Sequence, residues 1–165
     1  MRTAYRVPHA FRADAIWQAT DDLALSFGGA FENWSELSDT NLVLGAVESN
    51  VHLGFKDTWK LRGGIHYRLD ERWMLQTGLS YDSSALNTSD RTAALPIDEQ
   101  WRWGIGGTYD WSESTTIGFG FQYTNLGDAN IDNAALKGNY KNNEIFFFML
   151  NLNFAKLPWD GKASF

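Results

Sequence analysis

The chain has 165 residues, no cysteine and a formal net charge of -6. The acidic balance argues against a nucleic-acid partner, and the lack of cysteine excludes both a disulfide framework and a thiolate metal site. No apolar run approaches the roughly 20 residues that a membrane helix needs. A transmembrane β-barrel escapes this last test, because only every second residue of its strands faces lipid.

Aromatic residues make up 15% of the chain and include 8 tryptophans, and glycine occurs 15 times. Tryptophan and tyrosine concentrate at membrane–water interfaces, where an amphipathic ring suits the headgroup layer. A tryptophan-rich β-sandwich or a carbohydrate-binding module has a similar composition. Composition alone therefore leaves a membrane barrel and a soluble β-protein open.

Apolar and polar residues alternate along most of the chain, which predicts β-strands and not helices. Seven strands are expected, in chain order over residues 12–19, 23–31, 59–69, 73–81, 101–111, 115–123 and 143–154. In the third strand, Trp59 and Ile65 share an apolar face, whereas Lys60 and Arg62 share a polar one. We expect residues 51–55, which keep the parity of Trp59, to continue this strand and not to form a separate one.

The connections between these strands alternate in length. Short polar turns are expected near residues 20–22, 70–72 and 112–113, and long polar loops near residues 35–55, 84–98 and 126–142. Short periplasmic turns at one end and long extracellular loops at the other are typical of outer-membrane barrels. We therefore expect an all-β fold, namely part of an antiparallel up-and-down transmembrane β-barrel in a bacterial outer membrane.

An odd number of strands leaves such a barrel incomplete. If the short turns are periplasmic, the first and seventh strands both run toward the periplasm, and closing the sheet on itself would need a parallel seam. Bacterial single-chain barrels have even strand numbers, and open edges in lipid are costly. We therefore expect a missing N-terminal part with an odd number of strands. Residues 1–10 also lack the apolar region of a signal peptide, so we expect either a removed signal or a longer native protein.

Five stretches of the chain form a recognisable set: Trp34-Ser35, Lys56–Leu69, Trp73–Asp82, Leu95–Trp101 and Gly106–Tyr109. The second contains Asp57-Thr58-Trp59 feeding a strand, and the third contains the pattern L-x-x-G-x-x-Y-D. As a set they resemble the C-terminal half of the FadL/TodX-type outer-membrane transporters, and the resemblance extends to about Phe154. The family has an Asp-Arg pair where this chain has Glu99-Gln100, so no role is carried over for that pair.

The resemblance implies a fourteen-stranded barrel with an N-terminal hatch, of which this chain would supply strands eight to fourteen. It implies passive transport of long-chain fatty acids or other hydrophobic compounds, without covalent chemistry or a cofactor. The implied partners are outer-membrane lipid, a hydrophobic small-molecule ligand, the missing N-terminal half and the barrel-assembly machinery. The alternatives are a truncated barrel remnant with a structural role only, and an outer-membrane hydrolase.

Two sets of residues are candidates for function. The first set consists of polar residues that are expected to face the lumen, namely Lys60, Arg62, His66, Arg68, Gln76 and Arg102. Their expected role is either to meet an anionic headgroup or to balance the charges of Asp14, Asp82 and Asp110. The aromatic residues expected to form membrane girdles are Trp17, Trp59, Tyr67, Trp73, Tyr81, Trp101, Trp103, Tyr109, Trp111 and Tyr123. A sugar-stacking platform is the alternative for the aromatic set.

No catalytic residue or metal ligand is expected. The three histidines, His9, His52 and His66, lack the spacing of metal ligands. No nucleophile-elbow sequence frames a serine, and the glycines alternate along strands instead of opening a helix.

The loops and the C-terminus carry two smaller expectations. Apolar loop residues such as Leu86, Leu95 and Ile97 are candidates for an extracellular site that first captures a ligand. Residues 1–154 are expected to be barrel and residues 155–165 a periplasmic tail, with either Phe154 or Phe165 as the aromatic residue read by the assembly machinery.

Overall fold

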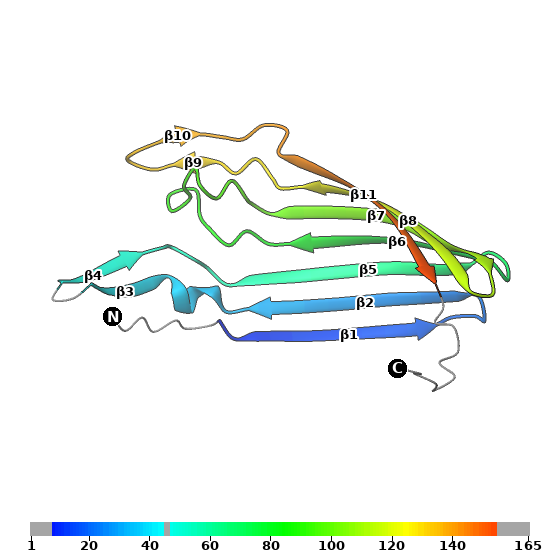
Figure 1. The fold of residues 1–165 in the computed structure, drawn as a ribbon. Helices are drawn as coiled ribbons and strands as arrows, with labels where there is room; N and C mark the ends of the chain where they lie inside the picture. Colours follow the sequence, from blue (N-terminus) through cyan, green and yellow to red (C-terminus); the bar gives the residue numbers. More distant parts are fainter. Residues whose placement is uncertain (1–7, 45–46, 155–165) are drawn as a thin grey trace, which may run out of the picture.

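The computed structural model describes residues 8–44 and 47–154, and its main feature is one antiparallel sheet whose strands follow one another in chain order (Figure 1). The seven strands are β1 (Ala10–Gln18), β2 (Leu23–Glu32), β5 (Thr58–Arg68), β6 (Trp73–Asp82), β7 (Gln100–Ser112), β8 (Thr115–Asn125) and β11 (Glu144–Phe154). The all-β class and each of the seven predicted strands are thereby confirmed.

Three short turns join β1 to β2, β5 to β6 and β7 to β8 at one end of the sheet, on the right in Figure 1. Side-chain oxygens at the turns accept backbone N–H groups, which explains why these polar residues end the strands. Asp70 Oδ1 accepts the N–H groups of Arg72 and Trp73, each at 2.8 Å. Thr20 Oγ1 accepts the N–H of Leu23 at 3.1 Å.

The long connections lie at the opposite end of the sheet, and two of them carry hairpins of their own (Figure 1). The first contains a 3₁₀ helix, Trp34–Leu37, and the pair β3 (Asp39–Leu44) and β4 (Val47–His52). The third contains the pair β9 (Ile131–Asp132) and β10 (Lys137–Gly138). The predicted sorting of short turns and long loops to opposite ends is present.

The expected continuation of β5 through residues 51–55 is wrong. Val51 belongs to β4, which pairs with β3 and not with the main sheet. Between β4 and β5 the chain turns at Gly54, whose φ of 66° is in the left-handed region that favours glycine. A side chain there would also collide with Asp90, since a Cβ atom would lie 2.5 Å from its Cγ. Leu53 and Phe55 therefore lie in the connection between β4 and β5, and β5 begins only at Thr58.

The sheet has no covered core among the described residues. The buried apolar residues are Ala30, Leu86, Ala129 and Ile131, and three of these four lie in the long connections. In contrast, Phe148 is 80% exposed and Leu150 is 75% exposed on β11. A soluble domain buries such residues against a second layer, so this apolar surface needs another covering. Within the described ranges, no helix is long and apolar enough to cross a membrane.

Candidate functional site

The sheet has two chemically different faces. On β1, β2, β5, β6, β7 and β8, even-numbered residues share the face that we call the polar face, and odd-numbered residues share the apolar face, up to the register shift between Asp110 and Ser112. On β11 the parity is reversed, because Phe147 pairs with Gln122 and Phe148 pairs with Phe121. The two-residue period of a strand thus converts the sequence alternation into two continuous surfaces.

All ten residues predicted as membrane girdles lie on the apolar face, in two groups near the strand ends. Near the loops are Trp59, Tyr81, Trp101, Trp103 and Tyr123, and near the turns are Trp17, Tyr67, Trp73, Tyr109 and Trp111. Neighbouring rings are in contact across strands. The ring centroids of Trp59 and Tyr81 are 4.9 Å apart, those of Tyr81 and Trp101 are 4.7 Å apart, and those of Trp73 and Tyr109 are 4.6 Å apart.

All six predicted lumen residues lie on the polar face, and three of them are already held in ion pairs. Lys60 Nζ lies 3.1 Å from Glu32 Oε1, and Arg102 Nη1 lies 2.7 Å from Asp82 Oδ2. Arg62 pairs with Asp14, and its Nε also donates to Asp14 Oδ1 at 3.0 Å. Each cation therefore has a carboxylate partner on a nearby strand.

Of the three predicted balancing carboxylates, two have this role and one has another. Asp14 and Asp82 neutralise arginines, whereas Asp110 accepts a hydrogen bond from the hydroxyl of Thr116 at 2.7 Å. Within the described ranges, His66 and Arg68 have no ion-pair partner. The candidates therefore fall into a neutralised group and an unpaired group.

The pair between Asp14 and Arg62 passes over the intervening strand β2 at Gly28. Register places Asp14 opposite Gly28, and Gly28 opposite Arg62. A Cβ atom at position 28 would lie 2.5 Å from Arg62 Nε, inside the space that the ion pair uses. Glycine at this position is therefore required for the two side chains to meet.

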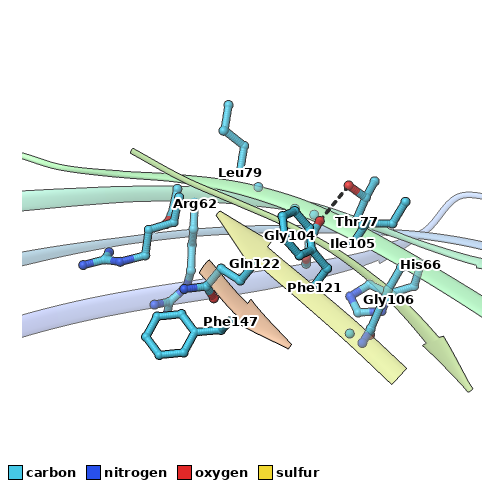
Figure 2. A pocket seen from close by; sticks show the side chains of 18 of the residues that line it. Arg62, His66, Thr77, Leu79, Gly104, Ile105, Gly106, Phe121, Gln122 and Phe147 are labelled. Atoms are coloured by element: carbon cyan, nitrogen blue, oxygen red, sulfur yellow. Dashed lines mark hydrogen bonds between the residues drawn. The ribbon is translucent and has the colours of Figure 1, made fainter. Parts of the chain in front are cut away.

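A hollow of about 520 Å³ lies on the polar face, and its lining residues come from six strands of the main sheet, β2, β5, β6, β7, β8 and β11. A hollow shared by that many strands requires the sheet to curl toward this face. Figure 2 shows Arg62, His66, Gln122 and Phe147 on the side of the hollow, whereas Leu79 points away from it. Its floor consists largely of glycines, namely Gly64, Gly78, Gly104, Gly106 and Gly120.

The predicted lumen residues are distributed unevenly around this hollow. Arg62, His66, Gln76 and Arg102 line it, whereas Lys60 and Arg68 do not. Sequence reasoning missed the glycine floor and the apolar end, formed by Phe147 and Met149 on β11. The signal was present as glycine recurring on the polar parity of adjacent strands, but only their register shows that these glycines are neighbours.

The second and third long connections, residues 83–99 and 126–143, pack together into what we call the loop cap. Its centre is Arg91, which is 1% exposed and lies 2.7 Å from Asp98 across an ion pair. The same guanidinium donates to the carbonyl of Asn130 at 2.6 Å and to that of Leu86 at 3.2 Å. Further hydrogen bonds between the two connections join Asn133 to Arg91, Tyr140 to Ala93, and Asn143 to Pro96.

The expectation that Leu86 belongs to an exposed capture site is wrong. Leu86 was a candidate for a surface capture site, but it is only 5% exposed because it packs inside the loop cap. Leu95 is 37% exposed, so it remains accessible. Sequence reasoning also missed Arg91, because a single arginine in a polar loop is usually solvated. Among the described side chains there is no group of three or more histidine and acidic residues that would hold a metal.

A family model described as "Outer membrane protein transport protein (OMPP1/FadL/TodX)" matches residues 3–154. Outer membrane protein P1 of Haemophilus influenzae (strain Rd) is 26% identical over 119 residues, which cover 71% of this chain and 26% of the relative. The long-chain fatty acid transport protein of Escherichia coli strain K12 is 24% identical over 114 residues, covering 68% of this chain and 24% of the relative. The aligned region of the chain thus spans about a quarter of the length of these relatives.

Two solved structures share the fold. A FadL homologue from Pseudomonas aeruginosa superimposes with a TM-score of 0.69 at 16% identity, covering 88% of this chain and 33% of the other. The CymD monoaromatic hydrocarbon channel superimposes with a TM-score of 0.51 at 22% identity, covering 73% of this chain and 31% of the other. The predicted outer-membrane location and the predicted resemblance are confirmed by these matches. The chain belongs to the OMPP1/FadL/TodX family of outer-membrane transport proteins.

Proposed function

We propose that this chain forms part of the wall of an outer-membrane barrel that lets hydrophobic compounds cross passively. The observation that carries the proposal is the pair of contrasting faces on one curled sheet, apolar on the outside and polar with a hollow on the inside. In this arrangement lipid covers the apolar face, and the ten aromatic residues near the strand ends act as girdles at the headgroup layers. The polar face lines the lumen.

The edges of the sheet support a barrel completed by further strands. In the described part of the chain, β1 and β11 each pair on one side only. Because neighbouring strands are antiparallel and seven in number, β1 and β11 run in the same direction. An unpaired edge in hydrocarbon leaves backbone groups without partners, which is unfavourable. An odd number of additional strands, supplied by an N-terminal part of the native protein, would pair both edges in antiparallel fashion.

Long-chain fatty acids or other hydrophobic compounds are the proposed cargo. The relative from E. coli is named a long-chain fatty acid transport protein, and CymD is described as a monoaromatic hydrocarbon channel. Selection would come from weak apolar contacts and a few polar groups, without covalent chemistry or a cofactor. Insertion would require the barrel-assembly machinery, with Phe154 on the apolar face as a candidate recognition residue. The proposed periplasmic tail, residues 155–165, lies outside the described residues.

The size of the native polypeptide tests the wall proposal. Outer-membrane fractions of the source cell are run on a gel with and without boiling, and the protein is detected with an antibody against this chain. We expect a band well above 18.7 kDa that shifts on heating, because a closed barrel resists detergent until heated. A native band at 18.7 kDa would contradict the need for additional strands and favour a barrel remnant.

Uptake tests the transport proposal. The native protein is reconstituted in lipid vesicles, and entry of labelled hexadecanoate and of labelled toluene is compared with entry into vesicles without protein. Faster entry of at least one compound is expected. If both compounds enter vesicles with and without the protein at the same rate, transport is not the function, even if the gel indicates a larger native protein.

A further inference from the structure

The glycine-floored hollow on the polar face is electrically neutral despite its arginines. Arg62 is paired with Asp14, and Arg102 is paired with Asp82 while also donating to Gln100 at 2.6 Å. Lys60, which lies beyond the lining, is paired with Glu32. An anionic ligand at either lining arginine must therefore displace a carboxylate that the sheet itself holds in place, or lie beside it. Both are unfavourable, since like charges in close contact repel each other.

Two polar side chains in the hollow, His66 and Gln76, are free to form hydrogen bonds with a ligand. His66 and Gln76 face each other across β5 and β6, and within the described ranges neither has a side-chain hydrogen bond. At the other side of the hollow, Phe147 and Met149 present apolar side chains that are 54% and 55% exposed. One side of the hollow can thus bond a polar group, and the other can cover a hydrocarbon body.

The floor provides the room between these two sides. A Cβ atom at Gly104 would meet only the carbonyl of Phe121, at 3.7 Å, so a side chain there would project into open space. At Gly106 a Cβ atom would lie 2.6 Å from the carbonyl of Phe119, so that glycine is required by the backbone. Gly104 therefore keeps the hollow open without being needed for sheet packing. A volume of about 520 Å³ lies within the range of small-molecule sites.

We infer that this hollow is a transit site for uncharged hydrophobic molecules that carry a single hydrogen-bonding group. The ligand's polar group bonds to His66 or Gln76, and its hydrocarbon part lies over Gly104 toward Phe147 and Met149. The inference rests on the proposed function, because it needs the polar face to line the lumen. It departs from the expectation that the arginines receive an anionic headgroup.

Two probes with the same tail and ring separate the neutral site from an anion site. The probes are 4-hexylphenol, which is uncharged at about pH 8, and 4-hexylbenzoate, which is ionised there. Binding to the native protein in detergent is measured by calorimetry at low and high salt. We expect the phenol to bind at least about tenfold more tightly, with little salt dependence. Tighter binding of the benzoate, weakened by salt, would overturn the inference.

Filling the floor tests the location. Gly104→Leu places a side chain in the hollow, whereas Gly29→Leu places the same side chain on the apolar face outside the lining, where the nearest atom to a Cβ atom would lie at 3.5 Å. We expect Gly104→Leu to weaken binding of 4-hexylphenol by about tenfold or more, and Gly29→Leu to change it by less than about twofold. Both variants are checked for the heat-dependent gel shift of a folded barrel. Unchanged binding in a folded Gly104→Leu protein would show that the hollow is not the site.

Gln76→Leu tests the polar contact. The variant should lower the affinity for 4-hexylphenol while leaving that for hexylbenzene unchanged, since only the phenol uses the hydrogen bond. An equal loss for both probes would contradict this role for Gln76.

Vesicle uptake separates a failure of the transit site from a failure of the proposed transport function. If the wild-type protein speeds entry of hydrophobic compounds but Gly104→Leu binds normally, only the transit site fails; if the wild type speeds no entry, the transport function fails.

Discussion

At the scale of single residues, glycine decides which charged groups can meet. Asp14 and Arg62 lie on strands that are not neighbours, and their side chains join over β2 only because Gly28 has no side chain. Residues Asp14 and Arg62 are 48 positions apart in the sequence. The ion pair is therefore a product of register, and the same register places a glycine, and not a larger residue, between its partners.

Gly28→Ala should break this ion pair and destabilise the barrel. The added methyl group would lie 2.5 Å from Arg62 Nε, so the guanidinium must move away from Asp14. Both side chains are close to half exposed, so the loss from the pair itself is about 1 kcal/mol or less. Denaturant unfolding of the native protein measures it, with Gly63→Ala as the control on the apolar face. Equal stabilities of the two variants would contradict the crossing of β2.

At the scale of elements, the loop cap holds three of the four buried apolar residues in the described chain. Arg91 is its only large, fully buried side chain, and its guanidinium bonds to both long connections. A buried guanidinium needs several acceptors to replace water. The carbonyls of Leu86 and Asn130 with the carboxylate of Asp98 supply them at Nη1 and Nη2, whereas Nε has no hydrogen-bond partner among the described residues. The two connections therefore fold as one unit around a charged centre.

Arg91→Met should loosen the loop cap while leaving the sheet intact. Methionine fills part of the volume but leaves Asp98 without its cation, and breaking a buried pair costs about 3 kcal/mol. Hydrogen exchange of the Asp132 amide, which bonds to the carbonyl of Thr88 at 2.9 Å, reports the local opening. Lys137→Met is the control, since Lys137 is 78% exposed in its pair with Asp132. Similar exchange in both variants would show that Arg91 does not hold the loop cap together.

The β3–β4 hairpin has a pH-sensitive pair at its base. His52 Nδ1 lies 2.7 Å from Asp39 Oδ1, and the hydrogen bond and negative charge of Asp39 raise the pKa of His52. The pair's stabilisation is therefore complete below the ordinary histidine pKa of 6.5 and is lost as the pH rises through the raised value. Amide exchange in β3 and β4, corrected for intrinsic rates, should show weaker protection at high pH. Asp39→Asn should remove the pH dependence of this protection. If the pH dependence remains in the variant, a group other than the His52–Asp39 pair causes it.

At the scale of the whole molecule, the sequence predicts the strands, because the two faces of the sheet differ in polarity. Alternation shows the strands because one face meets lipid-like surroundings and the other meets polar ones, as in β6 from Trp73 to Asp82. The hairpin β3–β4 was missed because its segment lies in a polar loop whose parity happens to continue that of β5. The neutral pairing of Arg62 and Arg102, and the burial of Arg91, depend on register and loop packing, which alternation does not encode.

The sorting of turns and loops predicts a single orientation across the outer membrane. The chain has no cysteine, so Lys137→Cys in β10 and Glu71→Cys in a short turn each introduce one thiol. A bulky, polymer-linked maleimide added to intact cells should label position 137, and position 71 only after the cells are broken. The reason is that the short turns of an outer-membrane barrel stay in the periplasm, while the long loops lie outside the cell. The reverse labelling would invert the orientation, and labelling of both positions in intact cells would contradict a membrane-spanning sheet.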